Sequence, residues 1–576
     1  MKLFKTCLLA ASVAALASAG AVAQSYNVKI LETPNSVKNL LGSKINDQGL
    51  VNLTAHAPLN AELDFDLILP SLLANSGIPL DFDPEEDTLT LQQYDRLILL
   101  LADKQNQLTE AQRIATTFGA VYNGQTVELP ALLNTAGNGA SSTENSSDSQ
   151  FLGLNQNNIQ VGIASAPYYR TEFTYTPPAS GDEEPTPITK NFAQRDFTSR
   201  GIWYDGSQLK LITPTEQEVL GGESALFDIN EHNVAAGYMS VSLTPQGADR
   251  VTGCQEYAEE ENANTSLYNC VWLGWFNAQS STVGSMRQNL SIYDMHATIW
   301  QLDAQGEVVS FESYEPLSPR REDDEEAMST YAYAINNNDI AVGQSWTYLG
   351  DNVDFFFRTK MPAIFVNGET RPVTTDNQYT WGSATDINNE DIAVGFVYKT
   401  IQGYGRSLPF TFNVNTNEFE LLPQFFASSS TFPAAINDNG FIVGRGEIDY
   451  SLDSIRRQAG FVYDPSAPEK GLQNLNDLVG CSATDYFIVA ADDINENNEI
   501  VATAIRKVER VDVDGSTYEE DQLFSLLLTP TGDDNGLGCS NDSETIERQG
   551  AATSLLSLLA MLLIGGLITV RRKFGA

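Results

Sequence analysis

The sequence predicts an all-β fold: a β-propeller of about seven four-stranded blades, with a helical insertion near residues 89–118 and a transmembrane helix near the carboxy-terminal end. Three observations carry this prediction. A short phrase containing Asn recurs seven times, an aromatic phrase alternates with it, and the later copies are spaced by the length of one blade. An open β-solenoid and two smaller β-domains are the alternatives, because the same hairpins could also stack in a row.

The chain begins with the features of a secretory leader. Lys2 and Lys5 form a short positive region, an apolar run follows, and the small residues Ala21 and Ala23 suit a signal peptidase. The run is too short to span a bilayer comfortably, so cleavage after Ala23 is expected. Residues 1–23 are therefore assigned to a signal peptide, and residues 24–530 to the repeated β-domain.

The Asn phrase predicts one hairpin in each repeat. Residues 335–343, for example, read INNNDIAVG. Asn, Asp and Gly tolerate a positive φ and their side chains cap turns, and the apolar run that follows suits a strand buried on both faces. A structural role in these turns is therefore assigned to the asparagine of each copy: Asn46, Asn155, Asn230, Asn336, Asn388, Asn437 and Asn495.

The aromatic phrase predicts a second hairpin. It places an apolar, aromatic strand before a polar turn, as in residues 201–206 (GIWYDG) and 363–368 (AIFVNG). Two hairpins per repeat make four strands. The last three intervals between repeat asparagines are 52, 49 and 58 residues, which fits one four-stranded blade each. The first apolar strand, residues 26–31, is expected to complete the last blade beside residues 523–528 and so close the ring.

The earlier intervals, of 109, 75 and 106 residues, are longer and require insertions. Residues 89–118 have helical spacing and predict a helix. Residues 138–150 are rich in Ser and Asn and are expected to be disordered. Residues 177–187 form a segment rich in Pro and acidic residues, residues 250–269 an acidic loop, and residues 316–327 a charged loop.

Charge and cysteine content restrict the partners. The net charge is −42, and loss of the leader brings it near −44. Such a surface would repel nucleic acid and anionic lipid and attract cations, including Ca²⁺, and basic partners. The favoured alternative is that the charge serves solubility in a salty medium. Four cysteines follow the leader, so three pairings are open in an oxidising compartment. The most local one joins Cys254 to Cys270 and would leave Cys481 for Cys539. The chain has no CxxC pair and only three His, so a zinc site is not expected.

The carboxy-terminal end predicts a membrane helix. Residues 551–570 carry no charge and are long enough to cross a bilayer core, residues 531–550 form a polar spacer, and residues 571–576 hold a basic cluster typical of a cytoplasmic end. The helix is either a retained anchor or a sorting tail that is removed. Bacterial sorting tails have a motif before the helix, whereas Gly565 and Gly566 lie inside it. The predicted location is the periplasm or the cell surface.

The repeat resembles a known class of sequence. The phrase Ile-Asn-x-x-Gly-x-Ile-Val-Gly, followed by an aromatic strand, is similar to the HAF-type extracellular repeats of bacterial secreted proteins. The whole plan of leader, repeats and apolar tail resembles an uncharacterised family of secreted gammaproteobacterial proteins. The likeness covers residues 26–530 without the insertions, and the first and last copies lack the terminal Gly. It implies a fold and export, and no activity.

No motif for catalysis stands out, and no catalytic residue is assigned. Nucleophile elbows, HExxH and phosphate-binding loops are absent from the sequence, and His56, His232 and His296 are far apart in it. No cofactor is expected, except that calcium is left open by four weak ligand candidates in two short acidic segments: Asp512, Asp514, Asp81 and Asp83. A plain β-turn between two strands is the favoured explanation of the first segment, and a solvated acidic loop leading to the helix is the alternative for the second.

Three functions remain open. The leading hypothesis is an exported, non-enzymatic protein of the envelope or surface that binds a protein or glycan through a propeller face. The second is an exported hydrolase, glycosidase-like, on the same scaffold, because carboxylates are plentiful. The third is a structural surface protein whose acidic loops are stiffened by Ca²⁺. All three expect membrane contact only through residues 551–570.

Overall fold

The computed structural model describes residues 25–102, 110–133, 146–179, 185–261, 263–280, 291–349, 358–451 and 455–531. The predicted signal peptide, the spacer almost entirely, the carboxy-terminal helix and the basic end lie outside these residues. Among the helices that are described, none is both long and apolar enough to cross a membrane.

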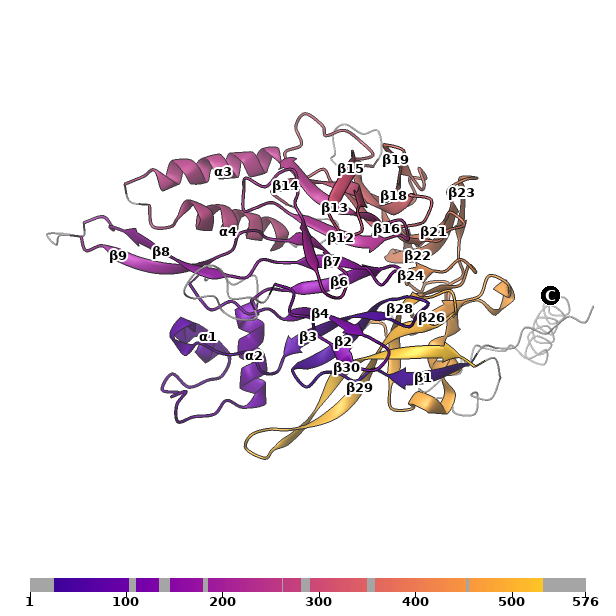
Figure 1. The fold of residues 1–576 in the computed structure, drawn as a ribbon, viewed down its shortest axis with the longest axis horizontal. Coiled ribbons are helices and arrows are strands. Elements are labelled where there is room, and N and C mark those ends of the chain that lie inside the picture. The colour runs from indigo at the N-terminus through magenta and orange to yellow at the C-terminus, as the bar shows by residue number, and fades with distance from the viewer. Residues whose placement is uncertain are drawn as a thin grey trace, which may run out of the picture. The chain divides into compact units, whose positions relative to one another are not determined.

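Seven antiparallel four-stranded sheets form the body of the protein, which is a seven-bladed β-propeller (Figure 1). In each blade the first strand is innermost, since it contacts the first strands of the neighbouring blades. From the inside outward, blades 1 to 3 consist of β2 (Val37–Ile45), β3 (Val51–Pro58), β4 (Thr117–Tyr122) and β5 (Val127–Glu128); β6 (Ser149–Leu154), β7 (Gln160–Ala164), β10 (Arg200–Tyr204) and β11 (Leu209–Ile212); and β12 (Ser224–Ile229), β13 (Val234–Leu243), β14 (Tyr293–Leu302) and β15 (Val308–Tyr314).

Blades 4 to 7 follow without large insertions. They consist of β16 (Thr330–Ile335), β17 (Ala341–Tyr348), β18 (Arg358–Val366) and β19 (Glu369–Pro372); β20 (Trp381–Ile387), β21 (Ile392–Ile401), β22 (Tyr404–Asn413) and β23 (Glu418–Leu421); β24 (Thr431–Ile436), β25 (Ile442–Glu447), β26 (Gln458–Tyr463) and β27 (Gln473–Asn474); and β28 (Phe487–Ile494), β29 (Ile500–Val511) and β30 (Thr517–Pro530). Short helical turns near the join of blades 6 and 7 are η2 (Pro468–Lys470), α5 (Leu475–Leu478) and η3 (Gly480–Ala483).

The last blade is completed by the start of the chain, as the sequence predicts. Strand β1 (Tyr26–Ile30) pairs antiparallel with β30, with Tyr26 opposite Pro530 and Ile30 opposite Leu526. The ring is therefore closed by main-chain hydrogen bonds between the two ends of the repeated domain. This pairing covers the β30 edge, which would otherwise be open to other chains. The solenoid and two-domain alternatives are thereby excluded.

Each pair of adjacent blades buries its own apolar cluster. Blades 1 and 2, for instance, enclose Phe151, Val121 and Ile202, and blades 7 and 1 enclose Val501 with Leu53. Five further clusters fill the five remaining interfaces. Because both faces of every blade pack on a neighbour, the second strands are apolar on both sides, which explains their unbroken Ile and Val runs.

The turn prediction is confirmed in all seven repeats. The residue three positions after each repeat Asn is Gly, Asn or Asp, and its φ lies between 58° and 80°. The glycine that ends most copies of the Asn phrase is required for a reason other than turn geometry. A Cβ on Gly343 would lie 1.9 Å from the backbone oxygen of Tyr331, where β16 bulges toward β17. The repeat glycine therefore permits close contact between the first two strands.

Three insertions lengthen the early repeats, and their structures differ in part from the predictions. The first contains η1 (Phe65–Leu67), α1 (Pro70–Asn75) and α2 (Leu91–Ala102), so the predicted helix at 89–118 ends earlier and residues 117–122 form a strand. The second contains the hairpin β8 (Tyr169–Tyr175) and β9 (Ile188–Gln194) on either side of the Pro- and acid-rich segment. Of the segment expected to be disordered, residues 149–150 belong to β6, and 138–145 lie outside the described residues.

The prediction of an acidic loop at residues 250–269 is wrong. Helices α3 (Pro245–Ala258) and α4 (Leu267–Ser280) occupy this insertion. Thr244 caps α3 by accepting a hydrogen bond from the Gly247 N–H, and Pro245 stands at the first helical position, where a proline is tolerated. The tryptophans of α4 pack in an apolar cluster with Cys254 and Tyr293. The acidic residues lie on exposed sides of the helical hairpin, which is why the segment reads as a solvated loop in sequence.

Candidate functional site

The repeat asparagines connect the blades in a closed circle. In each copy, Nδ2 of the Asn donates a hydrogen bond to the backbone oxygen of the corresponding Asn in the next blade, over 3.0–3.2 Å. The circle ends where Asn495 donates to Asn46. In every copy Oδ1 also accepts the N–H of the residue four positions further on. Turn capping is thus confirmed, and the asparagines also join the ring.

A buried group of charges lies two residues before the Asn in four of the innermost strands. This hub cluster consists of Lys44, Asp228, Asp386 and Asp493, and Lys44 Nζ lies 3.3 Å from Asp493 and 4.0 Å from Asp386. Burial raises the pKa of Asp228 to about 7 and that of Asp493 to about 6, against the influence of Lys44. Burial by itself would lower the pKa of Lys44, but the three carboxylates raise it.

Each carboxylate of the hub cluster also accepts a hydrogen bond from a backbone N–H of the next blade. Asp228 accepts the N–H of Ile335 over 2.9 Å, and Asp386 accepts that of Ile436 over 2.8 Å. Asp493 accepts the N–H of Ile45 over 2.8 Å. These contacts satisfy backbone donors inside the ring. The hub cluster is therefore a structural element of the propeller.

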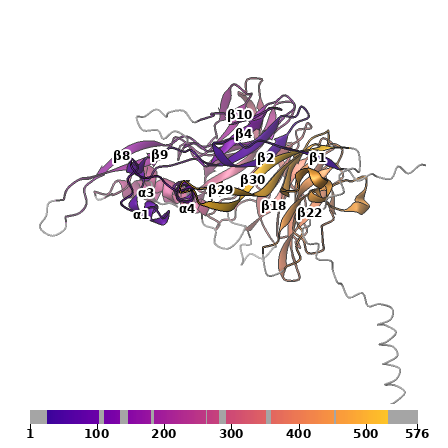
Figure 2. The same ribbon diagram turned by 90° about the horizontal axis from the view of Figure 1, so that it is seen from below.

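The three insertions emerge from one face of the propeller. Each joins the second and third strands of its blade, whereas the repeat turns join the first and second, so insertions and repeat turns leave the antiparallel blades at opposite ends. We call residues 59–116, 165–199 and 244–292 together the cap. Both ribbon views place α1, α3, α4, β8 and β9 at the same side of the blades (Figures 1 and 2).

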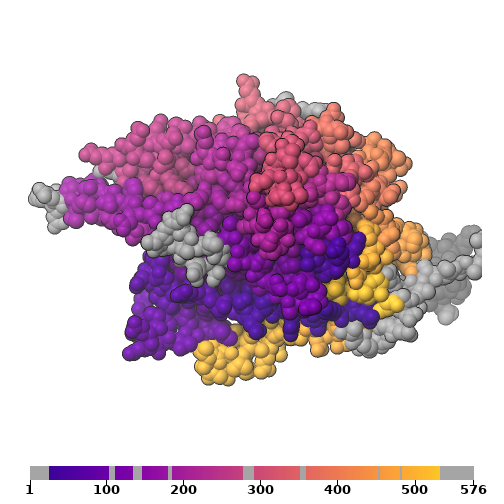
Figure 3. All heavy atoms as spheres, viewed as in Figure 1, coloured from indigo at the N-terminus to yellow at the C-terminus, as the bar shows by residue number. Residues whose placement is uncertain are grey.

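Direct contacts hold the cap together. Arg170 on β8 donates from Nη1 to the backbone oxygen of Glu110 over 2.7 Å, and Lys190 on β9 pairs with the Glu110 carboxylate at 3.1 Å. The guanidinium of Arg113 lies 5.4 Å from the Trp272 ring centre on α4. Insertions from three consecutive blades therefore contact one another, and their surfaces adjoin in the space-filling view (Figure 3).

A cavity of about 310 Å³ lies where the cap meets blades 1 to 3. Every insertion contributes to its wall, through Ala102 at the end of α2, Arg195 after β9 and Trp275 on α4. Glu223, before β12, and Tyr238, on β13, line it from the propeller. At this cavity the cap and the ring jointly expose polar and aromatic groups, and all three insertions reach it, so it is the candidate functional site. We call it the cap pocket.

The side chain of Glu223 is anchored on the wall of the cap pocket. Trp275 Nε1 donates a hydrogen bond to Glu223 Oε1, and Thr198 Oγ1 lies 3.3 Å from the same oxygen. Burial raises the pKa of Tyr238 well above its ordinary value, and the charge of Glu223 adds to this shift. The phenol of Tyr238 is therefore a neutral hydroxyl at any physiological pH.

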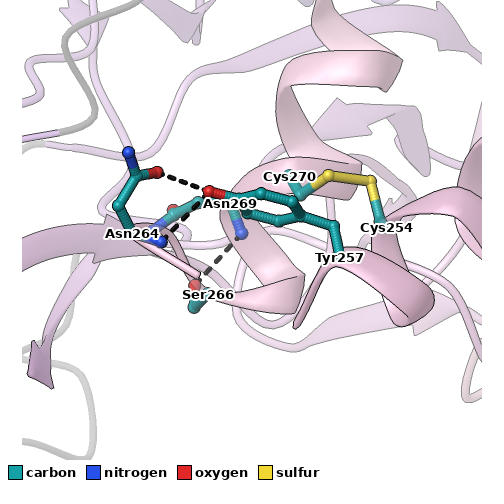
Figure 4. Close-up of a disulfide and its surroundings, with 6 residues drawn as sticks. All are labelled: Cys254, Tyr257, Asn264, Ser266, Asn269 and Cys270. Carbon is teal, nitrogen blue, oxygen red and sulfur yellow. Dashed lines mark hydrogen bonds between the residues drawn. A yellow bond between two sulfur atoms is a disulfide. The ribbon is translucent and has the colours of Figure 1, made fainter. Parts of the chain in front are cut away.

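A disulfide braces the helices that carry Trp275. Cys254 on α3 is bonded to Cys270 on α4, which confirms the most local of the predicted pairings (Figure 4). Beside it the Tyr257 hydroxyl donates to Asn264 Oδ1 over 2.8 Å and accepts the Asn264 N–H over 3.1 Å, so the turn between the helices is tied back to α3. The predicted Cys481–Cys539 pairing reaches outside the described residues.

The calcium candidates lie in two separate turns. In the β29–β30 hairpin, Asp512 Oδ1 accepts the N–H groups of Leu91 and Val513, and Asp514 Oδ1 accepts that of Ser516. In the turn before α2, Asp83 Oδ1 accepts the N–H of Glu85, and Asp81 is exposed in the same segment. Within the described residues no group of three His, Cys, Asp or Glu side chains is arranged to hold a metal ion.

The three histidines are not brought into one site. His56 lies on β3 of blade 1, His296 on β14 of blade 3, and His232 in the repeat turn of blade 3. Burial lowers the pKa of both His56 and His296. The described part of the chain thus places none of them in the cap pocket.

No pattern in the sequence identifies the residues of the cap pocket. Arg195 and Trp275 stand in insertions of different repeats, 80 positions apart, and neither belongs to a phrase that recurs. Only the lengths of the first three intervals pointed to this part of the chain. The pocket exists because ring closure aligns the insertions of adjacent blades.

The solved structures that resemble the chain include two archaeal proteins. The β-propeller domain of the Trilobed protease from Pyrococcus furiosus is 8% identical with a TM-score of 0.36, and the match covers 84% of this chain and 97% of that one. Pyrococcus horikoshii acylaminoacyl peptidase is 10% identical with a TM-score of 0.36; the match covers 85% of this chain and 54% of the peptidase. The chain therefore spans about half the length of that peptidase. No curated protein matches it in sequence.

One protein family matches almost the whole sequence, from residue 4 to residue 573. Its description is "Protein of unknown function (DUF3466)". The narrower likeness to HAF-type repeats stays a prediction. Because the match covers nearly the whole chain, the chain belongs to the DUF3466 family.

Proposed function

We propose that this protein is an exported, non-enzymatic binding protein that recognises a protein or glycan partner on the cap-bearing face of its propeller. A small group of the partner enters the cap pocket, and the surrounding cap surface contacts the rest. The ring supplies a rigid base, and the insertions supply the residues that select the ligand, as is common where loops stand on a stable scaffold.

The convergence of three insertions on one cavity carries this proposal. Binding sites are concave, with a few convergent polar groups among apolar ones, and the cap pocket has Arg195, Glu223 and Tyr238 beside Trp275 and Ile114. Blades 4 to 7 have no comparable insertions in their described residues. The cap therefore marks one side of the propeller as the binding side.

Export to the periplasm or the cell surface is part of the proposal. The leader at residues 1–23 and the apolar segment at 551–570 support it, and so does the Cys254–Cys270 disulfide, because such bonds persist in oxidising compartments. The helix at 551–570 would either anchor the protein or be removed with the tail.

Binding of the purified full chain to a panel of glycans and peptides tests the proposal. The matched variants are Ala102→Trp, which fills the cap pocket, and Phe311→Ala on the exposed outer strand β15. We expect the parent and Phe311→Ala to retain a ligand that Ala102→Trp loses. Equal binding by Ala102→Trp would contradict the role of the pocket, and turnover of a bound panel member would contradict a non-enzymatic function.

A further inference from the structure

We propose that the cap pocket binds a small ligand that carries one anionic group together with hydroxyl groups, a sugar acid or a sugar phosphate, and that Arg195 binds the anionic group. This inference rests on the proposed binding function and specifies its ligand. It starts from a charge that has no ion-pair partner among the residues that the structure describes.

The side chain of Arg195 is buried, and no described residue gives its guanidinium a polar partner. The residue is 6% exposed, and its Nε is buried and makes no hydrogen bond. Among the described residues, none accepts a hydrogen bond from this side chain and none places a carboxylate oxygen within 4 Å of it. A buried charge in this state is unfavourable, since the desolvation of a cation is normally offset by an anion or by several acceptors.

Two other buried arginines give their guanidinium groups polar partners, although Nη2 of Arg456 also has none among the described residues. Arg200 donates to the backbone oxygens of Ser199, Gly221 and Gly222. Arg456 pairs with the Glu447 carboxylate at 2.8 Å and donates to two backbone oxygens. In contrast to these two, the Arg195 guanidinium has no polar partner among the described residues, and it lies in the wall of the cap pocket.

Aromatic groups hold Arg195 in position. Its guanidinium carbon lies 5.1 Å from the centre of the Tyr168 ring and 5.6 Å from that of the Trp275 ring. Its backbone N–H donates to the Tyr268 hydroxyl over 3.1 Å, and the same hydroxyl lies 3.2 Å from its backbone oxygen. Aromatic rings can orient a cation. They cannot accept hydrogen bonds from the N–H groups that point outward in the plane of the guanidinium, so these donors remain for a carboxylate or a phosphate.

The rest of the wall suits hydroxyl groups and a single negative charge. Glu223, Asp148 and Ser149 line the pocket and offer acceptors to hydroxyls. The two carboxylates also oppose a second anionic group on the ligand. The cavity volume of about 310 Å³ is at the lower end of the range for small-molecule sites, which limits the occupant to one or two sugar rings.

Calorimetric titration of the full chain with glucuronate, glucose 6-phosphate and glucose tests the inference. The three probes share a ring and its hydroxyls and differ in the anionic group. We expect glucuronate or glucose 6-phosphate to bind, and glucose to bind at least tenfold more weakly. The Arg195→Gln variant should lose roughly 10- to 100-fold in affinity for the anion, which corresponds to hydrogen bonds to a charged group.

Two further variants separate the possible reasons for a loss. Arg195→Lys keeps the charge and should retain part of the affinity, and Arg457→Gln removes an exposed arginine outside the pocket and should bind like the parent. The ligand should raise the melting temperature of the parent and not that of Arg195→Gln. Equal affinity for glucose and the anions, or unchanged anion binding by Arg195→Gln, would overturn the inference.

The two proposals can fail separately. If the panel finds a neutral ligand that needs the open pocket and binds equally to parent and Arg195→Gln, the binding function holds and the anionic ligand is rejected. If neither the panel nor the three sugars bind, both proposals fail.

Discussion

At the scale of single residues, each repeat asparagine acts within its own blade and on the next one. Oδ1 of Asn388 accepts two N–H groups of its own turn, while Nδ2 donates to Asn437 in the following blade. The turn alone requires only an acceptor there, which Asp or Ser could supply. The recurrence of Asn in all seven copies is explained by the donor, because only the amide can also reach across to a carbonyl.

We expect Asn388→Ala to destabilise the protein by about 1–3 kcal/mol, because it leaves buried backbone groups unpaired on both sides of a blade interface. Asn388→Asp keeps the acceptor and removes the donor, so it isolates the contact between blades. Thermal melting of both variants measures the effect. Glu390→Ala, which removes an exposed side chain of the same turn for which the described residues show no side-chain hydrogen bond, is the control. Equal melting of Asn388→Ala and the control would contradict the role of the Asn circle.

At the scale of elements, the cap differs from the blades in what holds it. The blades bury apolar side chains on both faces, whereas the α3–α4 hairpin packs on blade 3 by one side only. The Cys254–Cys270 disulfide offsets this weaker packing, because it joins two residues that are 16 positions apart. Since Trp275 and Tyr268 on α4 orient Glu223 and Arg195, the disulfide indirectly maintains the cap pocket.

We expect the double variant Cys254→Ser, Cys270→Ser to loosen α4 while the ring stays intact. A loop of about 15 residues closed by a disulfide stabilises by about 3 kcal/mol. Hydrogen exchange should therefore speed up in residues 267–280, and β17 in blade 4 serves as an internal control that should not change. Unaltered protection of α4 would show that packing alone keeps this helix in place. Faster exchange in β17 would show that the disulfide supports the whole ring.

At the scale of the whole molecule, the hub cluster joins blades that are far apart in the chain. It combines Lys44 of blade 1 with Asp228 of blade 3, Asp386 of blade 5 and Asp493 of blade 7. Burial makes ionisation of these carboxyls unfavourable, and the single lysine offsets only part of it. The stability of the ring should therefore depend on pH.

The sign follows from linkage. The folded-state pKa of Asp228 is about 7, above the unfolded value of about 3.9, so the folded state binds the proton more tightly. Its contribution is favourable at low pH and is lost as the pH rises from about 4 through 7. We expect the melting temperature of Asp228→Asn, relative to that of the parent, to rise as the pH increases over that range. The exposed Asp249→Asn is the control. A difference that does not change with pH would contradict this.

The local chemistry of the repeats explains why the fold was predictable. Blade number, the strand order within a hairpin and the pairing of β1 with β30 follow from turn residues and apolar runs that act over about ten positions and recur. The insertions were less predictable. Their helices in residues 245–280 are set by packing on blade 3, and the acidic composition of the segment masked the two amphipathic surfaces.

By itself the sequence determined the architecture of the described chain: the repeats, four strands per repeat, and a ring that closes on its first strand. Only the tertiary structure decided what the ring brings together, namely the Asn circle, the hub cluster and the cap pocket. The reason is distance along the chain. The bond from Asn495 to Asn46 spans 449 positions, and the groups around Arg195 come from three insertions. Such contacts arise from closure and from the alignment of adjacent blades, which no local pattern records.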